Sequence, residues 1–123
     1  MPQVRNLKVL RRRSDFLAVA GHGRKWVTPH FVMQIAPPPA DLVAEGDFVV
    51  FYGLTASRKV GGAVQRNRAR RRLREVARQI LTAHAVGGQA YILIAREATI
   101  SCEFSELQKN LMWALKRTKS WID

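Results

Sequence analysis

The sequence predicts an α+β fold: a small two-layer sandwich in which a mixed sheet of about four strands carries helices mainly on one side. Three observations support this: short segments of strand-type composition, longer segments with apolar residues three and four apart, and the alternation of the two along the chain. With 123 residues, of which 47% are hydrophobic, the chain is expected to form one domain over residues 1–123. Residues 1–12 are expected to be a flexible basic tail.

Each element is predicted from its own local pattern. Ser14 is the expected N-cap of the first helix, and Gly21 and Gly23 end that helix. Runs of β-branched and aromatic residues predict the strands, and helical spacing of apolar residues predicts the later helices. In chain order, the expected elements are a helix over 14–20, a strand over 25–36 with a separate strand at 26–28 left open, a strand over 47–57, a helix over 63–84, a strand over 90–96 and a helix over 102–121.

The strand expected at residues 47–57 has two unlike faces. One row of alternating side chains is apolar throughout. The other row becomes small and polar toward its end, at Gly53, Thr55 and Ser57. A face covered by a helix would stay apolar, so this row predicts a face that is left open to a ligand.

The charge of the chain indicates an anionic partner. There are 21 Lys and Arg residues against 9 Asp and Glu, which gives a formal net charge of +12. Residues 58–78 hold nine basic residues and one acidic residue, Glu75, and residues 1–28 form a second basic segment. Such an excess predicts binding to a nucleic acid or another polyanion.

Seven arginines lie between residues 66 and 78, on the predicted long helix. An apolar stripe from Ala69 to Ile80 faces the core, and the arginines occupy most of the remaining circumference. Arg66 lies within the angular range of the stripe, so the first turn is expected to project beyond the sheet. There the helix dipole and free N–H groups would act on phosphate together with Arg58, Lys59, Arg66 and Arg68.

Two glycines precede this helix. Gly61 and Gly62 carry no side chains, so both are expected to let a backbone or an ion approach the helix start. Asn67 adds an amide donor and acceptor between two guanidinium groups. The segment "SRKVGGAVQRNRARRRLRE" thus combines a loop, a helix start suited to anions and a basic surface.

This segment resembles the protein component of bacterial ribonuclease P. The resemblance rests on "RNR" at residues 66–68, on "SRKVG" before it and on "ARRRLRE" after it, and it extends from "SDF" through "YILIAR" to the closing helix. Members of that family are small basic partners of a catalytic RNA, and together they remove the 5′ leader from precursor tRNA. The resemblance also implies a left-handed βαβ crossover, against the usual right-handed rule, in a fold shared with a ribosomal protein domain.

The same resemblance implies the partners and the sites. The expected partners are the catalytic RNA of ribonuclease P and precursor tRNA, with a monomeric protein on one RNA. Mg²⁺ is the expected cofactor of the holoenzyme, bound mainly by the RNA, and the protein is expected to have no catalytic residue and no metal site. The RNA contacts are assigned to Arg58, Lys59, Arg66, Asn67, Arg68, Arg70, Arg71 and Arg72. A cleft for the single-stranded leader, between the first helix and the open face of the sheet, is assigned to Phe16, Val32, Gln34, Thr55 and Ser57.

Three positions depart from the family's pattern. Gly62 stands where the family commonly has Asn, so a contact by that side chain is missing. Ala20, one turn after Phe16, and Gln34 stand where aromatic residues are often found in the family. If stacking holds the leader nucleotides, fewer aromatic side chains are present to do so, and weaker leader selectivity is expected.

Other functions have less support in the residues. No cluster of carboxylates, no His and Cys metal set and no paired nucleophile and base indicates a stand-alone nuclease. His22, His30 and His84 are scattered and are expected in loops or at the surface. The alternative is a ribosome-associated basic RNA-binding protein without a nuclease role, which the RNR motif and its lead-in argue against. A DNA-binding regulator would need a second helix beside the arginine helix.

The location of the protein is also predicted from the sequence. No stretch approaches the roughly 18 consecutive apolar residues of a membrane span. No apolar run of about seven residues follows the basic N-terminal residues, as a secretory signal would require. We therefore expect a cytoplasmic protein with no membrane partner.

Overall fold

The computed structural model describes residues 6–38 and 49–122. Its strands are β1 (Asn6–Val9), β2 (Arg24–Val27), β3 (Phe31–Ala36), β4 (Val49–Thr55) and β5 (Gln89–Ala95). Its helices are α1 (Arg13–His22), the short 3-10 helix η2 (Arg58–Val60), α2 (Ala63–His84), α3 (Glu97–Ser101) and α4 (Phe104–Arg117). The predicted α+β class is confirmed.

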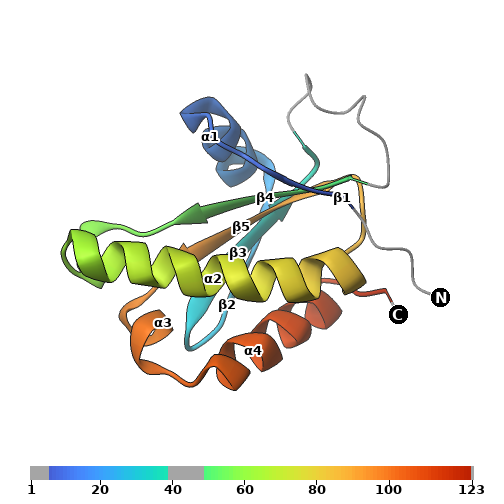
Figure 1. The fold of residues 1–123 in the computed structure, drawn as a ribbon. Coiled ribbons are helices and arrows are strands. Elements are labelled where there is room, and N and C mark those ends of the chain that lie inside the picture. The colour runs from blue at the N-terminus through green and yellow to red at the C-terminus, as the bar shows by residue number, and fades with distance from the viewer. Residues whose placement is uncertain (1–5, 39–48, 123) are drawn as a thin grey trace.

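All five strands form one mixed sheet in the order β1-β4-β5-β3-β2. β1, β4 and β5 run parallel, β3 is antiparallel to β5, and β2 is antiparallel to β3. α2 connects β4 to its parallel neighbour β5, so both strands end at the edge of the sheet where α2 begins. Figure 1 shows α2 crossing the sheet, with its N-terminal end extending past the ends of the strands.

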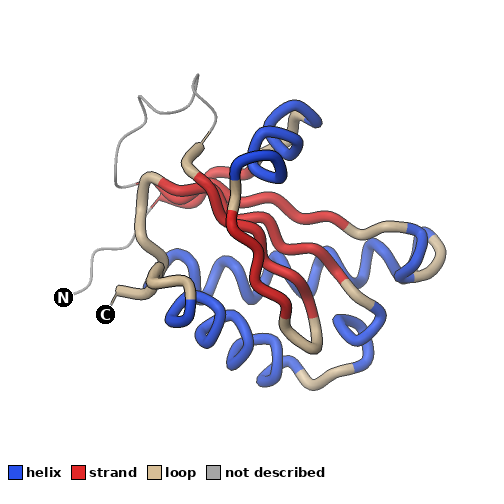
Figure 2. Tube along the Cα trace, turned by 180° about the vertical axis from the view of Figure 1, so that it is seen from behind, coloured by secondary structure: helices blue, strands red, loops and turns tan. Residues whose placement is uncertain are grey.

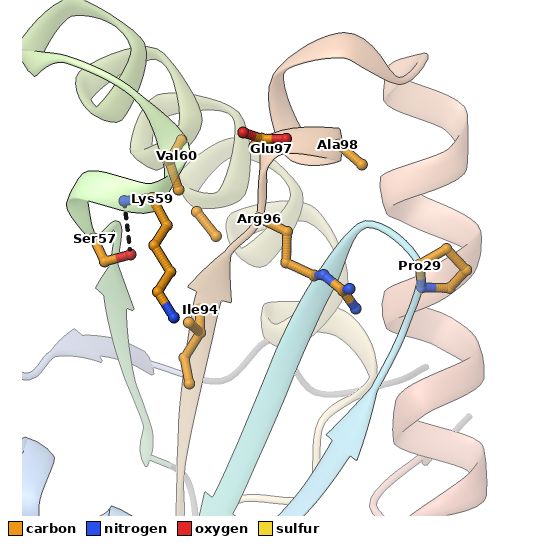
Figure 3. A pocket seen from close by; sticks show the side chains of 9 residues that line it. Pro29, Ser57, Lys59, Val60, Ile94, Arg96, Glu97 and Ala98 are labelled. Atoms are coloured by element: carbon orange, nitrogen blue, oxygen red, sulfur yellow. Dashed lines mark hydrogen bonds between the residues drawn. The ribbon is translucent and has the colours of Figure 1, made fainter.

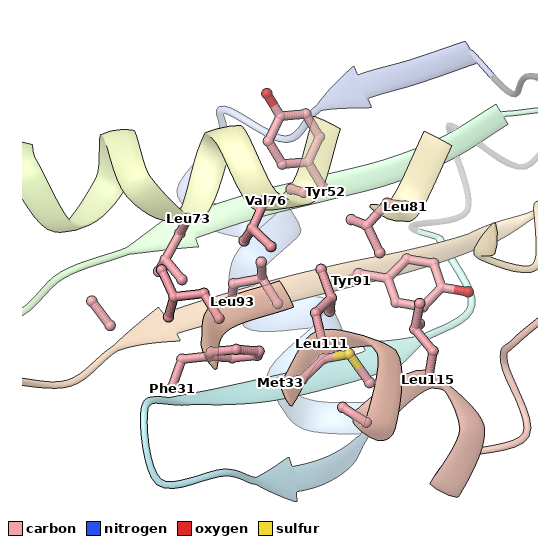
Figure 4. Close-up of a cluster of buried hydrophobic side chains, with 14 of the residues drawn as sticks. Phe31, Met33, Tyr52, Leu73, Val76, Leu81, Tyr91, Leu93, Leu111 and Leu115 are labelled. Carbon is pink, nitrogen blue, oxygen red and sulfur yellow. The ribbon is translucent and has the colours of Figure 1, made fainter. Parts of the chain in front are cut away.

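The main core lies between the sheet and the helices α2 and α4 (Figure 4). The apolar stripe predicted on α2 is buried at Ala69, Leu73 and Val76, and Ile80 packs half-buried at its margin. Strand alternation places every second residue of β3, β4 and β5 on this side of the sheet. The buried strand residues of this core include Phe31, Met33, Ile35, Val50, Tyr52, Tyr91 and Leu93.

A smaller apolar cluster lies on the opposite face of the sheet, under α1. Val19 is fully buried there with Phe51 and Ile92, and Phe16 packs against the same cluster. Figure 2 shows α1 over one end of this face and no helix over the rest of it. The helices therefore lie mainly on one side, and the open face is the one that the alternation in β4 predicts.

The N-terminal segment differs from the expected basic tail, of which residues 1–5 lie outside the described residues. Residues 6–9 form β1 and pair in parallel with residues 49–52 of β4. Leu10 is buried, and its backbone N–H donates to the carbonyl of Tyr52 at 2.6 Å. The free edge of β4 supplies hydrogen-bond partners that a short segment of mixed composition does not reveal by itself. The sheet therefore has one strand more than the sequence predicts.

The strand expected over residues 25–36 is a hairpin made of β2 and β3. Thr28 forms the turn, because its Oγ1 accepts a hydrogen bond from the backbone N–H of Phe31 at 2.9 Å. The separate strand left open at residues 26–28 therefore exists, over residues 24–27. Residues 47 and 48 of the next predicted strand lie outside the described residues.

Two helix starts differ from the prediction. α1 begins one residue before Ser14, and its N-cap is Arg12. The Arg12 guanidinium holds the carboxylate of Asp15 through contacts of 3.1 and 3.2 Å, and Asp15 is buried. This ion pair stands where the sequence suggests a hydroxyl cap. The helix predicted over 102–121 begins at Phe104, after the separate short helix α3.

Candidate nucleic-acid interface

The first two turns of α2 stand clear of the core. No residue from 63 to 68 is buried, whereas Ala69 and Leu73 are fully buried. Arg66 is half-buried, and Asn67 and Arg68 are exposed. The projection that the position of Arg66 on the helix predicts is therefore present in the structure (Figure 1).

The guanidinium groups at this end carry charge that the described residues do not neutralise. Arg70 donates from Nη1 to Oδ1 of Asn67 at 3.0 Å, which leaves the NH₂ group of that amide as a donor. Arg66, Arg68 and Arg71 form no hydrogen bond or ion pair through their side chains with another described residue. An anion can therefore approach these groups without first breaking an internal ion pair.

Arg72 is placed differently from the other predicted RNA contacts. It is half-buried, and its Nη2 donates to the backbone carbonyl of Cys102, in the turn between α3 and α4. Its Nε is buried without a hydrogen-bond partner among the described residues. The guanidinium of Arg72 thus connects α2 to the α3–α4 turn instead of extending outward, which a helical projection of the sequence does not show.

The loop before α2 is a single turn of 3-10 helix with a defined cap. Ser57 precedes it, and its Oγ accepts a hydrogen bond from the backbone N–H of Lys59 at 3.3 Å. Arg58 and Lys59 are both exposed in this turn. The loop thus presents two cations next to the free end of α2.

The two glycines before α2 have different roles, although the sequence suggests the same role for both. Gly61 has φ of 143° and ψ of −160°, a conformation that side chains rarely adopt, and a Cβ there would lie 2.9 Å from Cβ of Gln65. Gly62 is the N-cap of α2 with φ of −74°, and a Cβ there would meet only Oε1 of Gln65, at 3.1 Å. Only Gly61 is therefore required by the backbone.

Replacing Gly61 with alanine is expected to lower the free energy of unfolding by about 1–3 kcal/mol, because the native backbone conformation is strained for any residue with a Cβ. The matched change Gly62→Ala should shift it by less than about 1 kcal/mol, since its φ is ordinary. Urea unfolding followed by circular dichroism measures both values. Equal destabilisation of the two variants would contradict the assignment of the loop conformation to Gly61.

Strand register brings the predicted cleft residues together on the open face. Val32 and Gln34 come from β3, Thr55 comes from β4, and the central strand β5 lies between them. Direct neighbours on adjacent strands share a face of the sheet. One row across β3, β5 and β4 consists of Gln34, Ile92 and Gly53, and the next row of Val32, Ile94 and Thr55.

Strand β2 widens this face beyond the predicted residues. Lys25 pairs with Gln34 and Val27 pairs with Val32, so both belong to the same two rows. Val27 is 53% exposed and adds an apolar side chain to the uncovered part of this face. Sequence reasoning missed Lys25, Val27 and Ile94, although the alternation of each strand carries the signal once the register is known.

Phe16 reaches this face from α1 and lies on Gly53. A Cβ at Gly53 would be 2.6 Å from Cε1 and 2.7 Å from Cζ of the Phe16 ring, so the absence of a side chain at residue 53 makes room for the ring. Phe16 is half-buried and packs against the smaller core cluster. The ring thus contacts the core and also borders the open rows of the sheet.

An open cavity of about 610 Å³ lies where the two predicted sites meet. Ser57 and Ile94 bring the open face of the sheet into its lining, and Lys59 brings the loop before α2. Arg96, directly after β5, adds a second cation, and Glu97 is the one acidic residue of the lining, so the lining keeps a net positive charge. In Figure 3 the Lys59 side chain extends beside Ile94, and Arg96 is directed toward the β2–β3 turn. The open face and the arginine helix are therefore joined by a basic cavity.

Arg96 is a candidate site residue that sequence reasoning missed. Its Nη1 donates to the carbonyl of Thr28 at 2.9 Å, and its backbone N–H donates to Oγ1 of Thr99 at 2.9 Å. The first contact holds the side chain at the cavity, and the second fixes the backbone of Arg96 at the start of α3. The sequence does contain a signal for this residue. Ser57 follows β4 and Arg96 follows β5, and because the ends of these two parallel strands meet at one edge of the sheet, the two residues are expected to lie close together.

The described histidines hold elements of the fold together. His30 and Asn110 are hydrogen-bonded through their side chains, and His84 Nδ1 lies 3.0 Å from the carbonyl oxygen of Ile122. The side chain of His22 lies outside the described residues. Among the residues that the structure describes, no group of three or more His, Cys, Asp or Glu side chains could hold a metal ion.

Comparison with known proteins agrees with the resemblance seen in the RNR segment. The family model for ribonuclease P matches residues 4–119. The ribonuclease P protein component of Paramagnetospirillum magneticum is 47% identical over 109 residues, which are 88% of this chain and 80% of that protein. The chain belongs to the bacterial ribonuclease P protein family. The relative from Erythrobacter litoralis is 38% identical and covers 90% of this chain and 85% of its own length.

Solved ribonuclease P proteins share the fold. The Staphylococcus aureus protein superposes with a TM-score of 0.74 over 93% of this chain and 97% of its own, at 24% identity. The Thermotoga maritima protein gives a TM-score of 0.69 over 89% and 96%, at 25% identity. As a family member, the chain is the protein subunit of the ribonucleoprotein endoribonuclease that processes tRNA. None of the described helices is long and apolar enough to span a membrane.

Proposed function

We propose that this ribonuclease P protein binds the catalytic RNA through the start of α2 and its preceding loop, and the 5′ leader of precursor tRNA along the open face of the sheet. The observation that carries the proposal is the basic cavity of about 610 Å³, because it joins the two surfaces at Lys59 and Arg96. An RNA held at the start of α2 and a strand lying on β3, β5 and β4 would meet there.

The RNA contacts that we propose are the exposed cations of the loop and of the first turns of α2. A cluster of unpaired guanidinium groups at a helix N-terminus suits phosphate, because the helix dipole and the free N–H groups add to the side-chain charge. Arg72, held by the carbonyl of Cys102, instead positions the helix. The contacts are assigned to Arg58, Lys59, Arg66, Asn67, Arg68, Arg70 and Arg71.

The leader is proposed to lie across two rows of the sheet that mix apolar and polar side chains. The Phe16 ring offers a stacking surface at one end, and the side chains of Gln34 and Thr55 offer hydrogen-bonding groups to bases or sugars. Ser57 leads toward the basic cavity. A surface of this kind accepts a single strand with little dependence on its sequence.

In this proposal the chemistry belongs to the RNA. Mg²⁺ bound there would supply charge stabilisation and an activated water. The described part of the chain offers no set of side chains able to hold the ion, so the protein acts by binding and orientation. The proposal includes action on precursor tRNA in the cytoplasm, with one copy of the protein on one catalytic RNA.

The test is reconstitution with a bacterial ribonuclease P RNA. The protein should stimulate removal of the 5′ leader from a precursor tRNA at low, near-physiological Mg²⁺. Under these conditions few cations screen the repulsion between the phosphates of the catalytic RNA and those of the substrate, and the basic protein reduces that repulsion. Stimulation should be larger for a precursor with a leader several nucleotides long than for one with a single leader nucleotide. Absence of stimulation, together with tight binding to ribosomal RNA, would instead support a ribosome-associated protein.

A further inference from the structure

A second hollow lies on the side of α2 that faces β1, far from the cavity described above. This α2–β1 hollow has a volume of about 470 Å³. None of its lining residues belongs to the proposed RNA or leader contacts. It is lined by Asn6, Leu7, Tyr52, Arg74, Arg78 and Thr82.

Two unpaired guanidinium groups line the hollow. Arg74 and Arg78 are exposed, lie one helical turn apart and form no hydrogen bond or ion pair through their side chains with a described residue. None of the residues that line the hollow is acidic. Like charges four residues apart on a helix destabilise it, so an anion between them would remove a repulsion.

Tyr52 adds a polar group that the core leaves unused. The residue is only 8% exposed, yet its hydroxyl forms no hydrogen bond with a described residue. Figure 4 shows this hydroxyl pointing away from the core, whereas Tyr91 of the same core donates its hydroxyl to the carbonyl of Val86 at 2.8 Å. This hydroxyl is not one of the buried polar atoms that lack a partner, so it reaches the surface of the hollow, where it can donate a hydrogen bond to an oxygen of a bound ligand.

The lining suits a phosphate group. A phosphate offers oxygens to two guanidinium forks and to the hydroxyl groups of Tyr52 and Thr82 at the same time. The midpoint of Arg74 and Arg78 lies nine residues beyond Asn67, which is about 14 Å along the helix at 1.5 Å per residue. A phosphate here is therefore a different one from any bound at the start of α2.

We propose that the α2–β1 hollow binds a backbone phosphate of the same RNA that contacts the start of α2. The inference rests on the proposed RNA binding and extends it to a second place on the protein. α2 then contacts the RNA along its exposed side as well as at its end, which fixes the rotation of the helix relative to the RNA.

The experiment measures equilibrium binding of the full chain to ribonuclease P RNA over a range of KCl concentrations. The variant with both Arg74→Gln and Arg78→Gln should bind on the order of tenfold more weakly at near-physiological salt, and its slope of log K against log salt should flatten by up to about two. Tyr52→Phe, which removes only a hydroxyl, should weaken binding about two- to tenfold.

The matched control carries Lys109→Gln and Lys119→Gln, which remove the same formal charge from exposed positions that line neither cavity. Lys109 lies 3.9 Å from Glu106 in an exposed ion pair, whose loss costs little. If the two double variants lose equal RNA-binding affinity, the loss depends only on net charge, and the proposal is overturned. If the hollow variants lose inorganic pyrophosphate binding in calorimetry but bind RNA like the wild-type chain, the hollow is a free-anion site and the proposal also fails. Failure of the proposed function can be distinguished from failure of the hollow proposal. In the first case the wild-type chain itself would not bind this RNA, whereas in the second the wild-type chain would bind it.

Discussion

Replacing both Arg66 and Arg68 with alanine is expected to weaken binding to ribonuclease P RNA roughly 10- to 100-fold at near-physiological salt and to flatten the slope of log K against log salt by up to about two. The reason is that both guanidinium groups lie at the free start of α2 without an internal ion pair, so each is available to a phosphate. Binding titrations at several KCl concentrations measure both quantities.

The same double variant should also lose most of the stimulation of leader removal at low Mg²⁺. Its fold should be intact, because neither residue is buried in the core. The Lys109→Gln and Lys119→Gln control removes equal charge elsewhere and should keep both binding and stimulation. An unchanged salt slope in the Arg66 and Arg68 variant would mean that these side chains are only solvated.

Phe16→Ala is expected to weaken binding of precursor tRNA to the reconstituted holoenzyme by about tenfold, while binding of mature tRNA changes little. A stacked base on an aromatic ring contributes about 1–3 kcal/mol, and only the precursor carries a leader that can reach the ring. Binding of the two tRNAs measured in parallel gives the ratio that tests this role.

Because Phe16 also packs against the core, its replacement needs a control that damages packing alone. Val19→Ala serves this purpose, since Val19 lies on the same helix, is fully buried and does not border the open face. It should lower the free energy of unfolding by about 1–3 kcal/mol and leave the ratio of precursor to mature tRNA binding unchanged. Equal losses for both tRNAs in Phe16→Ala would assign the ring to the core.

Local patterns in the sequence were sufficient to predict α2 and the open face of the sheet. The helical spacing of Ala69, Leu73 and Val76 predicts both the buried side of α2 and the free position of its start. The change from apolar to small residues at Gly53 and Thr55 predicts the uncovered side of β4. Both features depend on residues that are close in the chain, where periodicity determines which side chains share a face.

The features that the sequence did not predict depend on contacts between distant segments. β1 forms because β4 has a free edge, and Arg72 is turned inward by the carbonyl of Cys102, thirty residues away. The basic cavity requires Lys59 and Arg96 to meet at one edge of the sheet, which follows from strand order. Even the difference between Gly61 and Gly62 depends on one backbone angle that the two identical letters do not reveal.

The burial of α2 from Ala69 to Leu81 has a consequence for how RNA binding is driven. Arginine-rich peptides that are disordered when free must lose backbone entropy as they fold on RNA. Here the sheet and α4 already hold the helical backbone, so only side chains and ions need to reorganise. Association with RNA should then lack the large negative heat-capacity change of coupled folding, and its free energy should come chiefly from released counterions.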